Sequence, residues 1–403
     1  QITMEVLQKV AKHHGLVCLL HEKPFEGVNG CGKHNNWSFC TEEGDNILEP
    51  GDSPKDNIRF LTVLAAIIKG VDEYQDLLRI SVASAGNDHR LGANEAPPAI
   101  ISIYLGDELT AILDSIENHE EYTDNIDREL ILGVDALPPI AKDTTDRNRT
   151  SPFAFTGNKF EFRMLGSSLN ISCPNTILNT IVAEELSQFA DEIEAKNPKD
   201  MKACIMHIIR RTIHNHKRII FSGNGYSQGW KEEAKRRGLL ELKTTPDALI
   251  HYTDPKNIAL FEKHKVYNTS ELHARENILL TNYYQVIQIE AKTMIYMLRK
   301  QILPSVFNYE AKLATIIQTK KNSGISSPME EKMLKNIDKP LELVSNHVDK
   351  LETMIDKGFG NEKEAAFFAA NEMLPLMDAI RKLTDSKEKN VSKDDWPIPD
   401  YNE

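Results

Sequence analysis

Polar side chains alternate along residues 33–39, directly after a loop rich in glycine. His34, Asn36 and Ser38 are spaced two apart, and in an extended strand such residues point to the same face. The glycines of residues 27–32 free the backbone for a close approach to a ligand. A polar face on a strand flanked by buried elements is costly unless something occupies it. The segment is therefore a candidate ligand-binding strand, with an internally hydrogen-bonded histidine as the alternative.

A second group of charges lies on residues 159–164. Lys159, Glu161 and Arg163 alternate there with apolar residues and are expected to share one face of a strand. A carboxylate between two cations can be a structural ion pair, which is the default reading of such a strand. With His34 as a partner, Glu161 becomes one part of a divalent-metal site that further carboxylates or phosphate oxygens would complete.

Two loops carry further functional groups. Arg147 and Arg149 lie two apart in residues 146–150, and guanidinium groups hold phosphate through paired hydrogen bonds. Solvated surface charge is the alternative for this loop. Residues 86–98 are rich in small residues and place Glu95 beside a proline pair, as in a lid. On spacing alone, a simple solvated turn explains residues 86–98 better.

Short strands and a buried helix are expected to position these segments. Apolar or alternating patterns predict strands at 16–20, 33–39 and 160–164. The segment 57–68 is apolar on nearly all sides and predicts a buried helix that Gly70 closes. The candidate chemistry thus lies on strands and on the loops between elements.

Helices account for most of the remaining chain. Residues 107–136 predict a polar helical insertion, and residues 84–98 a loop. From about residue 172 the pattern is predominantly helical, with one long helix over 270–302 that Pro304 ends.

Two rows of apolar residues follow the a/d spacing of helices packed lengthwise. They occupy residues 341–355 and 369–383, and Gly358 and Gly360 lie between them. Two short rows separated by two glycines predict an antiparallel helical hairpin.

The composition is that of an ordinary soluble globular chain. The 403 residues include 48 Lys and Arg and 60 Asp and Glu, which gives a net charge of -12. This negative charge argues against nucleic acid or an anionic membrane as the main partner. The longest apolar stretch, around 61–68, is too short to span a bilayer. Five cysteines without a C-x-x-C pair argue against a disulfide framework and favour the cytoplasm.

Taken in order, the four segments resemble motifs of the glutamine synthetase family. Residues 29–34 resemble its N-G-x-G-x-H motif, 94–97 its flap E-A-P, 146–149 its R-N-R loop and 161–163 its E-x-R strand. The residues within and around these segments resemble the type III class of the family, and this similarity covers essentially the whole chain.

The resemblance implies an α+β fold in two parts. Residues 1–304 would form a catalytic domain of the glutamine synthetase/guanido kinase-like kind, a curved antiparallel sheet with flanking helices. It would be incomplete at its N-terminus and would carry a polar insertion at about 99–145. Residues 305–403 would form a helical region with a polar tail.

The resemblance also implies a role for each candidate residue. His34 and Glu161 would bind the Mg²⁺ or Mn²⁺ that contacts the phosphates of ATP. Asn29 and Gly30 would hold the amino group of glutamate, and Arg90 and Arg163 its two carboxylates. The nucleotide would be lined by Asn36, Ser38 and Lys159. Arg149 would steady the transferring phosphoryl group, and Glu95 would close over the site and help deprotonate ammonium.

The implied reaction is the ATP-dependent ligation of ammonia to L-glutamate through γ-glutamyl phosphate. The implied assembly is a cytoplasmic homo-oligomer of two stacked hexameric rings, in which neighbouring subunits share each site. A related γ-glutamyl-amine ligase is one alternative. A non-catalytic assembly or regulatory protein of the same fold is the other.

The sequence departs from the family pattern at four places, one of which is the long segment from Ala96 to Asp146 between the flap and the arginine loop. Ala154 stands where the bacterial type I pattern has a second arginine, which leaves Arg147 as a substitute, and Asn36 stands where type I has histidine. The glutamates of a second metal and a small β-domain would precede Gln1, where the chain opens within an expected helix. We therefore predict that this polypeptide alone binds ATP and metal weakly and does not turn over.

Overall fold

The chain forms two compact units, residues 1–276 and 277–403. The boundary lies within the long helix α11 (Thr269–Met297), whereas the domain boundary at 304 stays a prediction. The structure is a computed structural model, and it describes residues 2–21, 23, 28–92, 96–120, 129–130, 140–141, 148–339 and 341–398.

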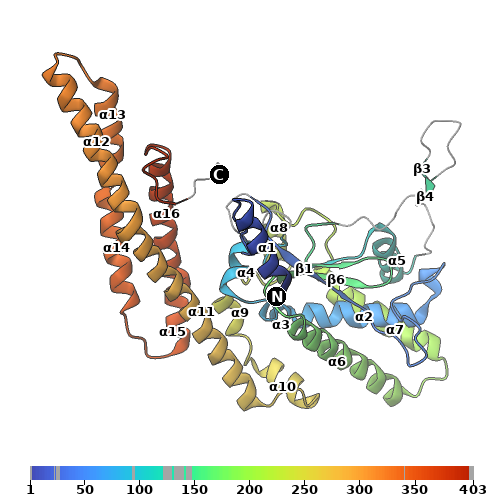
Figure 1. Cartoon of the computed structure of the whole chain (residues 1–403). Coiled ribbons are helices and arrows are strands. Elements are labelled where there is room, and N and C mark those ends of the chain that lie inside the picture. Colours follow the sequence, from blue (N-terminus) through green and yellow to red (C-terminus); the bar gives the residue numbers. More distant parts are fainter. Residues whose placement is uncertain are drawn as a thin grey trace, which may run out of the picture. The chain divides into compact units, whose positions relative to one another are not determined.

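A four-stranded sheet in the order β1-β6-β5-β2 lies in the first unit, and Figure 1 shows β1 beside β6. β1 (Gly32–Trp37), β6 (Phe160–Gly166) and β5 (Phe153–Phe155) pair antiparallel. β2 (Ile103–Tyr104) pairs parallel to β5. The strands predicted around 33–39 and 160–164 are thereby confirmed, and the sheet is antiparallel except at β2.

Aromatic side chains fill one side of this sheet, against α2 (Ile58–Glu73). The rings of Phe153 and Phe160 stack with centroids 4.5 Å apart, and Phe60 of α2 lies 5.8 Å from Phe155. The predicted buried helix is confirmed by α2, whose residues 63–68 are all buried.

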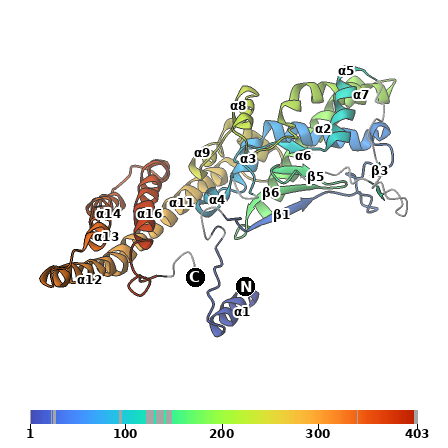
Figure 2. The ribbon, with the colours of Figure 1, turned by 90° about the horizontal axis from the view of Figure 1, so that it is seen from above.

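The same side of the sheet is covered by α6 (Ser172–Lys196), which lies beside α2 in both views (Figure 1, Figure 2). The Nδ2 atom of Asn35 donates to Asn175 Oδ1 at 2.8 Å, and Trp37 Nε1 donates to Asn179 Oδ1 at 2.9 Å. These bonds satisfy the buried polar side chains of β1.

The remaining elements of the first unit are mostly short helices. They are α1 (Ile2–His13), α3 (Gln75–Ile80), α4 (Ala85–Arg90), α5 (Asp107–Asn118), α7 (Met201–His216), α8 (Gln228–Arg236), α9 (Thr245–Leu249) and α10 (Pro255–Lys263), 3₁₀ turns at Pro54–Asp56 and Lys217–Ile219, and the strand pair β3 (Glu129–Leu130) and β4 (Ile140–Ala141). Helix α5 buries Leu109, Ile112 and Leu113 and packs on α7, so the start of the expected insertion contributes to the core.

Four expectations about local structure were wrong. Residues 16–20 form no strand and most of them are exposed, because no neighbouring strand in the described chain pairs with them. Helix α2 continues through Gly70 to Glu73, because packing against α6 holds this turn in the helix: a Cβ at Gly70 would lie in ordinary contact, 3.4 Å from Ile181 and Glu185. The expected loop at 84–98 contains helix α4.

The fourth concerns Pro304, which does not end the long helix. A π-helical turn, Leu298–Ile302, follows α11, and α12 (Leu303–Asn322) begins immediately after it. The helical backbone is continuous, since Ile302 keeps helical dihedral angles. The π-helical turn just before Pro304 accommodates a residue that has no backbone N–H to donate.

The second unit is helical in its described residues. It also contains α13 (Pro328–Asp338), α14 (Leu341–Ile355), α15 (Glu362–Phe368), a π-helical turn at Ala369–Met373 and α16 (Leu374–Glu388). Helices α14 and α16 pack together, with Gly358 and Gly360 in the connection (Figure 1). The predicted hairpin is confirmed, since Val348 and Ile380 from its two rows are buried.

The five cysteines are all free. Within the described parts of the chain, no helix combines the length and apolar character that crossing a bilayer requires.

Candidate active site

The predicted polar face of β1 exists. His34, Asn36 and Ser38 are exposed, while Asn35 and Trp37 between them are buried. This alternation follows from the two-residue period of the strand and from the anchoring of the buried pair on α6. The three polar side chains are thus available together on one face.

Strand pairing brings the two predicted metal ligands together across 127 residues of sequence. Asn36 lies opposite Glu161 in the β1–β6 ladder, and His34 Nδ1 lies 3.6 Å from Glu161 Oε2. The His34 side chain is 55% exposed and that of Glu161 12%. An imidazole nitrogen and a carboxylate oxygen facing one open side suit Mg²⁺ or Mn²⁺, with phosphate oxygens and waters as the other ligands.

Arg163 connects this pair to the neighbouring loop. Its Nε and Nη2 atoms donate to Glu161 Oε2 at 3.2 and 3.1 Å, and its Nη1 atom donates to the Asn148 carbonyl at 2.5 Å. Arg163 is buried, so its fork is held in place. The arginine therefore fixes the orientation of Glu161, and the expected ion pair and the expected metal ligand are parts of one arrangement.

The loop after Arg147 is supported by the segment 223–226. Asn148 Nδ2 donates to the Gly223 carbonyl at 2.8 Å, and Thr150 Oγ1 donates to Asn148 Oδ1 at 2.7 Å. The backbone N–H of Gly225 in turn donates to Thr150 Oγ1 at 2.9 Å. These bonds place Arg149 on a braced turn where its side chain is exposed.

Arg90 is buried at the C-terminal end of α4, directly behind the glycine loop. Its Nη1 atom donates to Asn87 Oδ1 and to the Met164 carbonyl, both at 3.3 Å, and its Nη2 atom donates to the Arg163 carbonyl at 3.4 Å. A Cβ on Gly32 would lie 2.0 Å from Arg90 Nη2. Only glycine at this position lets the guanidinium lie against β1.

The other predicted site residues lie at the margins of this arrangement or outside the described chain. Asn29 is exposed and Gly30 half-buried in the segment leading into β1, and Lys159 is half-buried in the turn between β5 and β6. Glu95 and Arg147 fall among residues that the structure does not describe. Their roles stay predictions.

Ala154, one of the departures from the type I pattern, is fully buried in β5. A long cationic side chain at this position would replace a core residue. Position 154 therefore supplies no cation beside Glu161, its partner in the β5–β6 ladder.

Residue patterns indicate little of the buried network around Arg90. Arg79, Asn87 and Asp88 were not among the candidate residues, yet all three side chains hydrogen-bond around α4. One signal was present: Ser84 accepts from the Asn87 N–H at 3.2 Å as the N-cap of α4, and serine is a preferred residue for that position.

Comparison with known proteins agrees with these motifs. Residues 204–321 match the glutamine synthetase C-terminal domain family. The chain is 44% identical to a type-3 glutamine synthetase of Dictyostelium discoideum over 99% of its length and 56% of that protein. It is 42% identical to a glutamine synthetase of Butyrivibrio fibrisolvens and 38% identical to one of Bacteroides fragilis, over 100% of the chain and 58% and 57% of those relatives.

The chain spans somewhat more than half the length of these relatives. The matches nevertheless run across both of its units, including the polar face of β1, the E-x-R strand and the helical hairpin. The chain therefore belongs to the glutamine synthetase family.

Proposed function

We propose that the protein containing this chain ligates ammonia to L-glutamate with ATP and Mg²⁺ or Mn²⁺. The observation that carries the proposal is the approach of His34 to Glu161, 3.6 Å apart, on the face that also presents Asn36. Arg163 holds both this carboxylate and Asn148, the middle residue of the R-N-R motif. Such a site serves phosphoryl transfer, where catalysis is mainly positioning and charge neutralisation.

His34 and Glu161 would hold the metal, which when bound neutralises charge on the phosphates of ATP. Asn36, Ser38 and Lys159 would line the nucleotide, so that its phosphates lie along the exposed face of β1. The Arg149 guanidinium would meet the γ-phosphoryl group as charge shifts during transfer.

The glutamate would lie on the Gly32 side of the sheet. Asn29 and Gly30 would accept hydrogen bonds from its amino group, and Arg90 and Arg163 would bind its two carboxylates. The side-chain carboxylate then attacks the γ-phosphorus, the bond to the β-phosphate oxygen breaks, and ADP leaves. Ammonia attacks the resulting acyl phosphate and displaces phosphate, after Glu95 takes a proton from ammonium.

The wider setting is proposed on the family relationship. The first unit would have the curved antiparallel sheet of the glutamine synthetase/guanido kinase-like fold. The protein would assemble in the cytoplasm as a homo-oligomer of stacked hexameric rings. That the 403 residues alone do not turn over stays a prediction.

The experiment is a steady-state assay of ADP and glutamine formation from glutamate, ammonia and ATP, with the polypeptide at its full natural length. The expected result is one glutamine per ADP, with Glu161→Gln lowering kcat/KM by at least about tenfold, the low end for a changed metal environment. Glu232→Gln, at an exposed position of α8, is the matched control and should behave as wild type.

Amine acceptors tested beside ammonia separate this activity from that of a γ-glutamyl-amine ligase. Turnover with a larger amine and none with ammonia would reject ammonia as the substrate. ATP-dependent product that is insensitive to Glu161→Gln would reject the site.

A further inference from the structure

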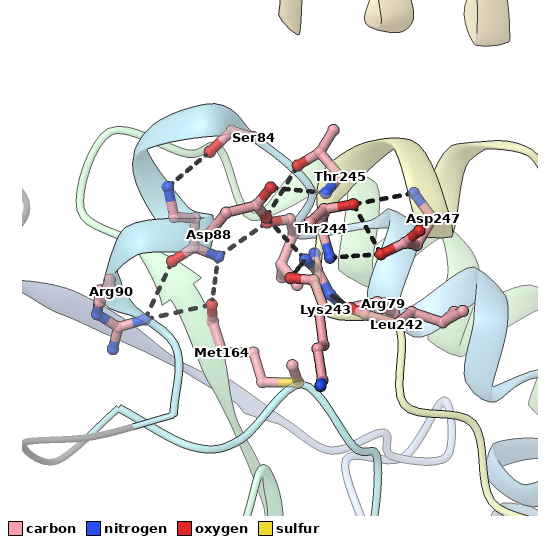
Figure 3. Close-up of polar contacts among 12 residues, drawn as sticks. Arg79, Ser84, Asp88, Arg90, Met164, Leu242, Lys243, Thr244, Thr245 and Asp247 are labelled. Atoms are coloured by element: carbon pink, nitrogen blue, oxygen red, sulfur yellow. Dashed lines mark hydrogen bonds and ion pairs between the residues drawn. The ribbon is translucent and has the colours of Figure 1, made fainter. Parts of the chain in front are cut away.

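Helix α4 is held on one side by a buried carboxylate (Figure 3). Asp88 Oδ1 accepts from Arg79 Nη2 at 2.7 Å and from Thr245 Oγ1 at 2.9 Å. Asp88 Oδ2 accepts from the Thr245 backbone N–H at 2.6 Å. Three elements, α3, α4 and α9, thus meet at one carboxylate group.

The partners of Asp88 are themselves fixed. Arg79 is only 1% exposed, and its Nε atom donates to the Leu242 carbonyl at 2.9 Å. Helix α9 begins with a capping box in which Thr244 and Asp247 hydrogen-bond each other reciprocally. The position of Thr245 at the start of this helix is therefore set independently of Asp88.

The other side of α4 is tied to the sheet. Asn87 Nδ2 donates to the carbonyls of Val82 and Met164, both at 2.8 Å. Asn87 Oδ1 accepts from Arg90. The same Met164 carbonyl also accepts from Arg90 (Figure 3). Consecutive residues of α4 consequently face opposite supports, Asn87 toward β6 and Asp88 toward α3 and α9.

A buried ion pair is a poor device for stability alone. Burial raises the pKa of Asp88, and Arg79 and Thr245 act against this by lowering it. Replacing such pairs by apolar residues is often neutral or stabilising in other proteins. The directional bonds of the pair instead specify where α4 lies.

We propose that Arg79, Asp88 and Thr245 are positioning residues that fix α4 and thereby hold the Arg90 guanidinium against Gly32 to receive a carboxylate of glutamate. The inference rests on the proposed function for the identity of the ligand. The network reaches the site through Arg90, whose guanidinium donates to the carbonyls of Arg163 and Met164, so its effect is expected first on the glutamate carboxylate that Arg90 would receive.

This assignment predicts a specific kinetic pattern. A contact that Arg90 makes equally to bound substrate and transition state changes KM and leaves kcat unchanged. Loosening α4 should therefore raise KM for glutamate without changing KM for ATP. A merely structural role would lower the amount of active enzyme, and with it the apparent kcat.

The experiment compares Thr245→Val, which removes one hydrogen bond, with Thr245→Ser, which restores it. Thr180→Val, at another buried threonine on α6, is the matched control. Thr245→Val should raise KM for glutamate about fivefold, the effect of one net hydrogen bond, and Thr245→Ser should return it toward wild type. Asp88→Asn should raise it further.

Backbone hydrogen exchange of residues 85–90 is measured in the same variants without substrate. We expect faster exchange in Thr245→Val and Asp88→Asn than in Thr180→Val. Unchanged exchange, or a rise in KM shared equally by glutamate and ATP, would overturn the inference. If the wild-type protein forms no product, the proposed function fails, whereas the exchange measurement still decides whether the network positions α4.

Discussion

Gly32→Ala should displace Arg90 with little effect on the fold. The new Cβ would lie 2.0 Å from Nη2 and 2.5 Å from Cζ, whereas ordinary contact begins at 3.4 Å. The guanidinium must therefore move by about 1.4 Å, the difference between these distances. Its three recorded hydrogen bonds are already 3.3 to 3.4 Å long, and a shift of this size breaks them.

The size of the kinetic effect follows from that displacement. A misplacement of about 1 Å can cost about 10²-fold in rate, or about 2.7 kcal/mol of transition-state stabilisation. We expect kcat/KM for glutamate to fall by this factor, mainly through KM, while KM for ATP stays near the wild-type value. The assay is γ-glutamyl hydroxamate formation from glutamate, ATP and hydroxylamine, again with the polypeptide at its natural length.

Gly229→Ala is the control for this substitution, because a Cβ there meets nothing within 4 Å. It should leave both Michaelis constants unchanged. Wild-type kinetics for Gly32→Ala would refute the placement of Arg90 against this loop. A large loss of thermal stability would instead show that the backbone, and not the arginine, gives way.

Two further predictions concern stability. Burial raises the pKa of Glu184, but hydrogen bonds, chiefly from Lys263 and with His264 contributing, outweigh burial and lower this pKa from 4.5 to about 2. The ionised Glu184 therefore stabilises the folded state fully above about pH 4.5, and this stabilisation is lost as the pH falls toward 2. This stabilisation amounts to at most about 3 kcal/mol. In urea titrations at several pH values, the free energy of unfolding of Glu184→Gln should fall less steeply with decreasing pH than that of wild type. An equally steep fall in both proteins would contradict the assignment. Phe153→Ala should lower the free energy of unfolding by about 3 to 5 kcal/mol, because the ring is fully buried. The control Leu343→Ala, at an exposed position, should lower it by less than about 0.5 kcal/mol in the same titration. Equal losses in the two variants would contradict the placement of Phe153 in the core.

The local parts of the site could be predicted from the sequence. Alternation alone placed His34, Asn36 and Ser38 on one face, and the structure has them there. It also set Glu161 beside Arg163 on a strand. These predictions succeeded because a strand's two-residue period is a local property of the chain.

The parts that depend on tertiary pairing could not be predicted from residue patterns. Nothing near Gly32 indicates that Arg90 will lie against it, since their approach is set by the β1–β6 ladder and by α4. Helix α4 itself was missed because Gly86 and Asn87 disfavour helix. The bond between Asp88 and Thr245 joins residues 157 apart in sequence, and no local spacing reports it.

Divalent-metal binding tests the central claim most directly. Mn²⁺ affinity is measured by electron paramagnetic resonance, with and without ATP, for wild type, His34→Ala, Glu161→Gln and the control Glu232→Gln. We predict that each site variant weakens Mn²⁺ binding by at least about tenfold and that the control matches wild type. Equal affinity in all four proteins would contradict the assignment of His34 and Glu161 as the metal ligands.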